Sequence, residues 1–220
     1  MTYNIISTGS KGNAVVINDR ILIDIGVPFK SLEPVKKDLR LVLLTHQHID
    51  HFNPRTVRTL AKERPTLRWG CCEWMVGPLL EAGVDKRRID VMYPDTPGET
   101  SHAMIYNGLA TVRPEPLVHN VPNCGWHIGH GHEWLFYATD TGTLDGVEAR
   151  GYDWYFIEAN HTRAELEARM EAKRAAGEFS YEWAAAQNHL SREQAEDWLY
   201  QQMGPNSRYV FLHQHQEKAD

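Results

Sequence analysis

The hydrophobic pattern of the first two thirds of the chain is that of short strands. Apolar, β-branched runs at 3–7, 14–18 and 20–26 are separated by turns of Gly, Asn and Asp, which is typical of strands. Residues 39–45, LRLVLLT, are almost continuously apolar, which predicts a strand buried on both faces. Shorter runs broken by Pro and Gly predict further strands between 68 and 140.

Residues typical of helix starts and ends predict three helices. Asn53 and Pro54 form an N-cap followed by proline at the first helical position, and they begin a helix over 54–64. In the last third there are two capping boxes, each a Ser or Thr followed three residues later by Glu or Gln. The first predicts a helix that ends at Gly177, and the second predicts a helix over 192–203. The boxes are Thr162 with Glu165 and Ser191 with Gln194.

Strands at 152–160 and 208–215 flank the predicted helices of the last third. The chain shows no internal repeat, low-complexity tract or interdomain linker. Many strands with a few interspersed helices predict an α/β fold in which two sheets pack face to face with helices outside. We expect one domain over 1–220.

Composition changes this picture little. Hydrophobic residues make up 42% and charged residues 24% of 220 residues, as in an ordinary globular protein. No apolar run is long enough to span a membrane, and the N-terminus lacks the pattern of a signal peptide. Three cysteines without metal spacing suit reduced thiols. We therefore expect a cytoplasmic protein with no membrane partner.

A cluster of histidines follows the apolar strand at once. His46, His48, Asp50 and His51 lie within HQHIDH. Imidazole and carboxylate are ligands for zinc, manganese or iron, and two metals about 3.5–4 Å apart can hold a bridging hydroxide. A solvated, histidine-rich turn is the alternative, and a single His-x-His pair would favour it. The complete H-x-H-x-D-H pattern at the end of a buried strand favours a binuclear metal site.

This pattern resembles the signature of the metallo-β-lactamase-fold hydrolases, and the resemblance covers essentially the whole chain. It implies an αββα sandwich with two mixed β-sheets and helices outside. Family members complete two metal sites with a later histidine, a bridging aspartate and a last histidine. The matching residues here are His119, Asp140 and His213.

The resemblance also implies how the ligands divide between two divalent metal ions, expected to be zinc, with manganese as the alternative. One ion would be held by His46, His48 and His119. The other would be held by Asp50, His51 and His213, with Asp140 bridging. Asp50 is counted both as a metal ligand and as a catalytic residue.

Two later stretches narrow the resemblance to the phosphodiesterase branch of the fold, which includes ribonuclease Z and the YycJ-like exonucleases. These are IEANH at 157–161 and NHLSREQAEDWL at 188–199. The resemblance implies that Glu158 and His189 cooperate in proton transfer. A carboxylate beside His189 would raise its pKa, and the N-terminus of the 192–203 helix would favour a phosphate. A polar strand end and a loop histidine near a cap are the alternatives.

The chain departs from these relatives in places. Asn120 follows His119, where the related exonucleases usually have Asp. The long arm with which ribonuclease Z grips transfer RNA has no evident counterpart, which argues against that substrate. His130 and His132 lie in an extra Gly-rich hairpin and favour a solvated turn over a metal site.

We therefore expect a metal-dependent hydrolase, a phosphodiesterase that acts as a nuclease on DNA or RNA ends. A nuclease needs a basic track, and two groups of cations offer one, although solvated helix faces are an equal interpretation. The groups are Lys36, Lys37 and Arg40, and Arg55, Arg58, Lys62 and Arg64.

Two further functions stay open. A small-nucleotide phosphodiesterase, acting on cyclic nucleotides as some phage proteins of the fold do to blunt host defence, fits the formal net charge of −6 slightly better. A non-catalytic, metal-stabilised module is the other, whereas a β-lactamase or thioesterase is disfavoured by the 157–161 and 188–199 stretches. The partner is thus a nucleic acid or a small nucleotide, and a homodimer is an open alternative.

Overall fold

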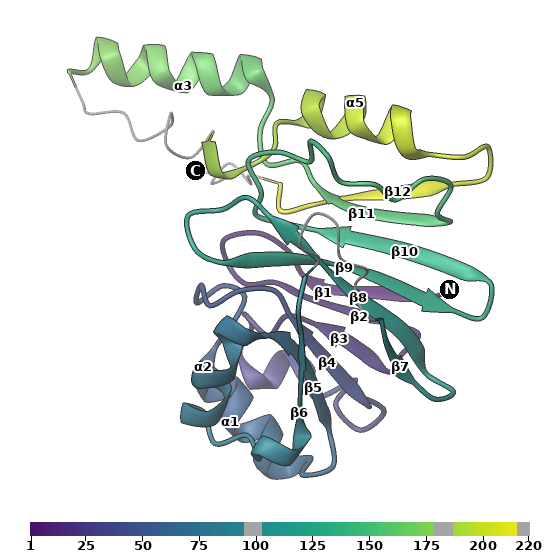
Figure 1. Ribbon diagram of the computed structural model, residues 1–220. Helices are drawn as coiled ribbons and strands as arrows, with labels where there is room; N and C mark the ends of the chain where they lie inside the picture. Colours follow the sequence, from purple (N-terminus) through teal and green to yellow (C-terminus); the bar gives the residue numbers. More distant parts are fainter. Residues whose placement is uncertain (95–102, 178–186, 215–220) are drawn as a thin grey trace.

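The computed structural model describes residues 1–94, 103–177 and 187–214, and it contains two six-stranded sheets packed face to face (Figure 1). In the first sheet the strand order follows the chain, with an antiparallel start and four parallel strands from β3 onward. Its strands are β1 (Tyr3–Ser7), β2 (Ala14–Ile17), β3 (Ile21–Ile23), β4 (Leu41–Leu44), β5 (Arg68–Cys72) and β6 (Ile89–Met92).

The second sheet has the order β12-β11-β10-β9-β8-β7. It is antiparallel from β7 to β10 and parallel from β10 to β12, so both sheets are mixed, as expected. Its strands are β7 (Met104–Tyr106), β8 (Ala110–Leu117), β9 (Asn123–His130), β10 (Glu133–Ala138), β11 (Trp154–Glu158) and β12 (Arg208–Leu212). His215, in the predicted 208–215 strand, lies outside the described residues.

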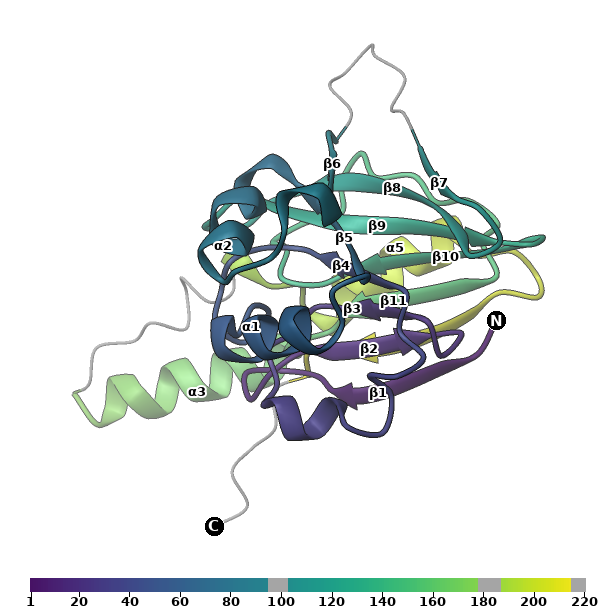
Figure 2. The ribbon, with the colours of Figure 1, turned by 90° about the horizontal axis from the view of Figure 1, so that it is seen from below.

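Helices cover the outer faces of both sheets, which gives the expected αββα layers (Figures 1 and 2). The first sheet packs against α1 (Pro54–Glu63) and α2 (Val76–Glu81), and the second packs against α5 (Arg192–Gln202). Helix α3 (Arg163–Ala175) buries no residue and extends away from the sandwich. Among the described residues, no helix is long and apolar enough to cross a membrane.

The buried side chains form three layers that hold the sandwich together. Between the sheets, residues such as Leu43, Trp126 and Phe156 are fully buried. Outside the first sheet, Val57 and Leu60 of α1 are fully buried, and outside the second sheet Trp198 of α5 packs on Phe136. The predicted strand at 39–45 is buried at every position from Leu41 to Leu44, which is why its sequence is apolar throughout rather than alternating.

The predicted helix starts are confirmed. Asn53 accepts hydrogen bonds from the backbone N–H groups of Arg55 and Thr56, with Pro54 at the first position. Both predicted capping boxes are present, at the starts of α3 and α5. These local bonds satisfy N–H groups that a helix leaves unpaired at its start, which is why these boundaries can be predicted from short stretches of sequence.

The segment from 68 to 140 contains mostly strands, as predicted, but it also contains helix α2, which was not predicted. Gly77 and Pro78 look like breaks in the sequence. Pro78 lies in the first turn of α2, where its missing N–H is tolerated. Leu79 is buried against the first sheet, so packing compensates for a sequence of weak helix propensity.

The topology brings several strand ends to one edge of the sandwich. Strands β10, β11 and β12 are parallel, and β8 runs in the same direction because two antiparallel pairings separate it from β10. In the first sheet the 45–53 loop leaves the end of β4 and passes against Gly26. A Cβ at Gly26 would lie 1.7 Å from the carbonyl oxygen of Asp50, so only glycine fits beneath this loop.

Replacing Gly26 by Ala is therefore expected to force the 45–53 loop away from β3. We expect Gly26→Ala to lower the free energy of unfolding by at least about 2 kcal/mol, because overpacking a tight backbone contact has a cost of this order. Urea denaturation measures the change. The matched control is Gly77→Ala in α2, since a Cβ added at this position would have nothing within 4 Å. Equal stability of the two variants would contradict the role given to Gly26.

Candidate metal centre

Four segments that are distant in the sequence supply the nitrogen and oxygen donors at this edge. The 45–53 loop after β4 carries four of the predicted ligands. His119 and Asp140 each lie two residues beyond a strand, β8 and β10, and His213 directly follows β12. The structure brings all seven predicted ligands together, in overlapping groups whose ligand atoms lie within 4.8 Å of one another. The seven are His46, His48, Asp50, His51, His119, Asp140 and His213.

Three imidazoles form the first group. Nδ1 of His48 lies 3.1 Å from Nε2 of His46 and 3.3 Å from Nε2 of His119. The other nitrogen of His119 faces the carbonyl oxygen of Asn188 at 3.2 Å, which orients the ring. Three imidazole nitrogens with this spacing would suit a divalent metal ion.

One carboxylate and two imidazoles form the second group. Oδ2 of Asp50 lies 3.8 Å from Nε2 of His51 and 3.7 Å from Nε2 of His213. Both rings are buried, whereas Asp50 is 24% exposed. Asp50 is therefore the ligand through which solvent or a substrate reaches this group.

Asp140 lies between the two groups. Its Oδ2 atom is 3.7 Å from Nε2 of His46 and in contact with Nε2 of His51, and its Oδ1 atom is 3.4 Å from Nδ1 of His213. The side chain is 3% exposed. A carboxylate between two sets of nitrogen donors is placed as a bridging ligand would be.

The donor atoms at the centre fit divalent cations. His213 Nε2 is buried and has no hydrogen-bond partner among the described residues, and the nearest carboxylate oxygen, Asp50 Oδ2, lies 3.7 Å away. Buried polar atoms without partners are costly, and an ion is one of the few things that satisfies them. A divalent metal ion held with Asp50 and His51 would give His213 Nε2 a partner.

Ionisation also favours a cation. Burial lowers the pKa of His46 to about 2, with the charge of His51 adding to the effect, so the ring is in the neutral form that binds metal. Burial alone would raise the pKa of Asp140, but the charge of His51 and hydrogen bonds from His189 and His51 hold it well below its ordinary value. The centre therefore contains an ionised Asp140 carboxylate beside the neutral ring of His46.

The groups that orient the ligands were not predicted from the sequence. Oδ2 of Asp24, at the end of β3, lies 2.7 Å from Nδ1 of His51, and the Thr45 hydroxyl lies 3.0 Å from Nδ1 of His46. Asp24 is fully buried and also accepts hydrogen bonds from Thr45. These contacts turn the Nε2 atoms of both rings toward the centre. An aspartate inside the apolar stretch RILIDIG was the available sequence signal.

Several of these residues have a left-handed backbone. The φ angles are 59° at Asp24, 54° at Asp140 and 51° at His213. Non-glycine residues rarely adopt this conformation, and they do so mostly where surrounding structure imposes it. All three follow the ends of strands and turn their side chains toward the same edge.

His189 and Glu158 meet beside the predicted ligands. Nδ1 of His189 lies 2.5 Å from Oε1 of Glu158 and 3.2 Å from Oδ1 of Asp140. Burial opposes the charged ring, but the hydrogen bonds to Asp140 and Glu158 outweigh it and raise the pKa of His189 to about 10. Glu158 is fully buried and also accepts from the backbone N–H of Thr141. With Nδ1 engaged, Nε2 of His189 is the atom available for proton transfer.

One expectation about α5 is wrong. Its N-terminus was predicted to favour a phosphate, but the chain's own groups occupy the N–H donors. The N–H of Arg192 donates to the carbonyl of His161, and that of Gln194 donates to the Ser191 hydroxyl. Glu193 adds a carboxylate in the first turn, where it would repel an anion.

His130 and His132 are exposed at the hairpin between β9 and β10, as expected of a solvated turn. Nδ1 of His130 lies 2.7 Å from the carbonyl oxygen of Leu109. Neither residue belongs to a donor group among the described residues.

The fold and the donor groups agree with a sequence-family match. A family model described as "Beta-lactamase superfamily domain" matches residues 19–213, a range that includes every predicted site residue. No protein in a search of curated sequences matches the chain.

Solved structures share the fold at low sequence identity. Human tRNase Z, short form, is 15% identical with a TM-score of 0.69, over 98% of this chain and 93% of that one. The metallo-beta-lactamase fold protein YhfI from Bacillus subtilis is 15% identical with a TM-score of 0.70, over 96% and 85%. Zn(2+)-bound PqqB from Methylobacterium extorquens is 10% identical with a TM-score of 0.65, over 97% and 89%. At these identities the likeness is one of fold alone.

The Asp24–His51 contact gives a direct test of the centre. Asp24→Asn keeps the shape of the side chain but removes the charge that orients and polarises His51. We expect it to weaken zinc affinity by about 10–100-fold, the usual effect of losing such an outer partner. Competition with a chromophoric chelator measures the affinity. The control is Asp38→Asn, at an exposed aspartate remote from the donor groups. Unchanged zinc affinity in Asp24→Asn would show that Asp24 has no part in holding metal.

Proposed function

The chain belongs to the beta-lactamase superfamily, and within it we propose that this protein is a metal-dependent phosphodiesterase that hydrolyses nucleic-acid strands. One observation carries the proposal. A histidine with a raised pKa, His189, is held by a buried glutamate at hydrogen-bond distance from the carboxylate that lies between the two donor groups. A proton donor is therefore available beside a candidate binuclear centre.

A proton donor at this position suits a leaving group that departs as an alkoxide. Phosphodiesters of nucleic acids release such a group, and its protonation lowers the barrier. The His189 ring stacks on that of His213 at 5.2 Å between centroids and lies 5.6 Å from that of His119. The donor ring therefore lies beside the ligand rings, and its side chain is 20% exposed to an incoming substrate.

Each residue has a defined part in the proposed reaction. Two divalent ions, zinc or manganese, when bound by the seven donors, would polarise a phosphoryl oxygen and lower the pKa of water. The partly exposed Asp50 carboxylate accepts a hydrogen bond from the attacking water. His189 donates the proton on Nε2 to the leaving oxygen. Glu158 holds Nδ1 of His189 and stabilises its charged form.

Two nucleases are among the proteins of similar fold, and two sequence stretches favour the same chemistry. The neighbours include human tRNase Z and a long-form RNase Z from yeast, which has a TM-score of 0.61 at 13% identity. The 157–161 and 188–199 stretches, which resemble this branch, supply Glu158 and His189. We do not extend the proposal to transfer RNA, because no counterpart of the gripping arm is evident in the sequence.

A cyclic mononucleotide is the second candidate substrate. The formal net charge of −6 favours it, since an acidic protein attracts a long polyanion poorly overall. A metal-stabilised module without turnover is the non-enzymatic candidate, and only an assay separates it from an enzyme.

The proposal is tested with bis-para-nitrophenyl phosphate and a substrate panel. Zinc or manganese should support release of nitrophenol, and a chelator should abolish it. The panel compares single-stranded DNA, RNA, duplex DNA and cyclic nucleotides. Metal-dependent cleavage of strands supports the proposal. Cleavage of cyclic nucleotides alone would replace it with the second candidate, and no turnover of any diester would leave the non-catalytic module.

His189→Ala separates proton donation from metal binding. We expect kcat on an oligonucleotide to fall by about 10²–10⁴-fold, the range for loss of a general acid. The loss on bis-para-nitrophenyl phosphate should be much smaller, because nitrophenolate leaves without protonation. Metal content, measured by elemental analysis, should stay at the parent value. Equal losses on the two substrates, or loss of metal, would show that His189 is not the proton donor.

A further inference from the structure

The two groups of basic residues that the sequence offers as a nucleic-acid track differ in how available they are to a ligand. Several of these side chains already have partners within the protein. Lys36 is bonded to Glu33 at 3.0 Å and to Glu63 at 2.6 Å. Arg64 donates hydrogen bonds to the backbone carbonyls of Lys36 and Leu39. These two side chains hold the 33–39 turn against α1, so they are not available to bind a nucleic acid.

The position of Arg40 also excludes it from a nucleic-acid track that reaches the metal centre. It directly precedes β4, whereas the metal-binding loop follows the other end of that strand. A substrate at the centre would have to pass along the full length of the sheet to reach it. The neighbouring Lys37 belongs to the same turn.

A different set of cations remains available on α1. Arg55, Arg58 and Lys62 are exposed, and their side chains have no hydrogen bond or ion pair within the part of the chain that the structure describes. Their spacing of three and four residues places them on one face of the helix. The helix begins three residues after the ligand His51, so this face starts at the edge of the centre.

A hollow connects this face to the metal-binding loop. Arg58 and Gln47 line the same hollow of about 400 Å³, which also includes Glu81. Gln47 lies between the ligands His46 and His48 and is exposed. Ile49, in the same loop, is 68% exposed and offers an apolar contact for a sugar or base. A strand that leaves the centre past Gln47 therefore meets Arg58 first.

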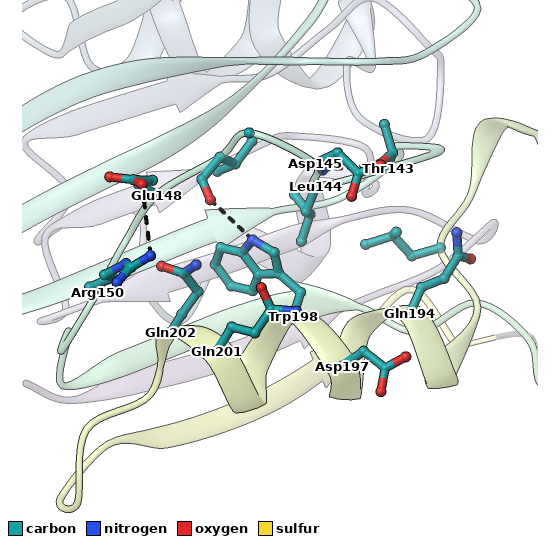
Figure 3. Close-up of a pocket in the computed structure, with 13 residues that line it drawn as sticks. Thr143, Leu144, Asp145, Glu148, Arg150, Gln194, Asp197, Trp198, Gln201 and Gln202 are labelled. Carbon is teal, nitrogen blue, oxygen red and sulfur yellow. Dashed lines mark hydrogen bonds and ion pairs between the residues drawn. The ribbon is translucent and has the colours of Figure 1, made fainter.

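The hollow beneath α5 has the opposite charge. It lies between the 143–150 loop and α5 (Figure 3), and three carboxylates line it. They belong to Asp145, Glu148 and Asp197. The one cation there, Arg150, lies 4.0 Å from Glu148. A polyanion would be repelled from this side of the molecule and directed to α1.

From this placement we propose that the α1 face formed by Arg55, Arg58 and Lys62 binds the phosphates of a single polynucleotide strand whose cleaved bond lies at the metal centre. The inference rests on the proposed function and names its substrate as a polymer rather than a mononucleotide. From Arg55 to Lys62 the helix rises about 10 Å. The face offers three cations along this length, so it can pair with up to three phosphates.

Binding of a fluorescein-labelled single strand of about 12 nucleotides, a length typical of such sites, tests the inference. The test variant combines Arg55→Gln, Arg58→Gln and Lys62→Gln. The matched control is Arg20→Gln, at an exposed arginine that precedes β3 at the far end of the sheet. DNA and RNA of one sequence are the two arms, and fluorescence anisotropy gives Kd across a salt series.

The triple variant is expected to raise Kd at least tenfold at low salt, while the control stays within twofold of the parent. The slope of log affinity against log salt should fall by about 2, from about 0.7 for each lost contact to a single strand. Glu81→Gln, which removes the negative charge beside Arg58, should lower Kd. Equal Kd and equal slope in the parent and the triple variant would overturn the inference.

Kinetics separate this inference from the proposed function. In the triple variant KM for the oligonucleotide should rise, while kcat and the turnover of bis-para-nitrophenyl phosphate stay within twofold of the parent. Metal-dependent cleavage of strands, with the same KM and Kd in the parent and the triple variant, would overturn the inference alone. Cleavage of cyclic nucleotides only, with no salt-dependent binding of strands, would overturn the inference together with the proposed function. If the parent hydrolyses no diester, the proposed function fails, and the anisotropy comparison still decides whether α1 binds a strand.

Discussion

The site depends on positive charge between carboxylates that the fold has buried. Asp24 and Asp140 face His51 from two sides, and Asp140 and Glu158 face His189 and His213. Burial opposes charge on His51, but the two carboxylates raise its pKa well above the ordinary value. Removing these acidic groups from water is costly unless cations accompany them. Divalent ions would supply the positive charge that these carboxylates need. They would displace protons from the imidazoles and be coordinated by the buried nitrogen and oxygen atoms.

The architecture explains why these groups meet. Parallel strands within the second sheet deliver Asp140, Glu158 and His213 to one edge, and β4 of the first sheet delivers the histidine loop to the same place. Each of these strands is anchored by apolar side chains between the sheets or beneath the helices. The rigid sandwich therefore fixes the donors, while loops that flank the edge are left to determine the substrate. Helix α1 follows the histidine loop directly and flanks the same edge.

Much of the fold could be predicted because short stretches of sequence specify the same helices and strands that packing stabilises. The apolar 39–45 run, Asn53 with Pro54 and the two capping boxes each specify one element and its boundary. The superfamily, the αββα layers and the convergence of seven donors also agree with the sequence-based expectations. Helix α2 was missed because packing of Leu79, rather than propensity, stabilises it. Asp24 was missed because its role depends on the distance to His51, which one sequence does not encode locally. The prediction of a phosphate site at α5 was wrong because the His161 carbonyl and the helix's own cap residue, Ser191, accept from its N–H groups.

Anomalous diffraction from a crystal grown with zinc tests the central claim most directly. We predict two peaks about 3.5–4 Å apart, the separation of binuclear hydrolytic centres. One should lie against His46, His48 and His119, the other against Asp50, His51 and His213, with Asp140 between them. Data from zinc-saturated crystals with no peak at this edge, or with ordered zinc bound only elsewhere, would contradict the account.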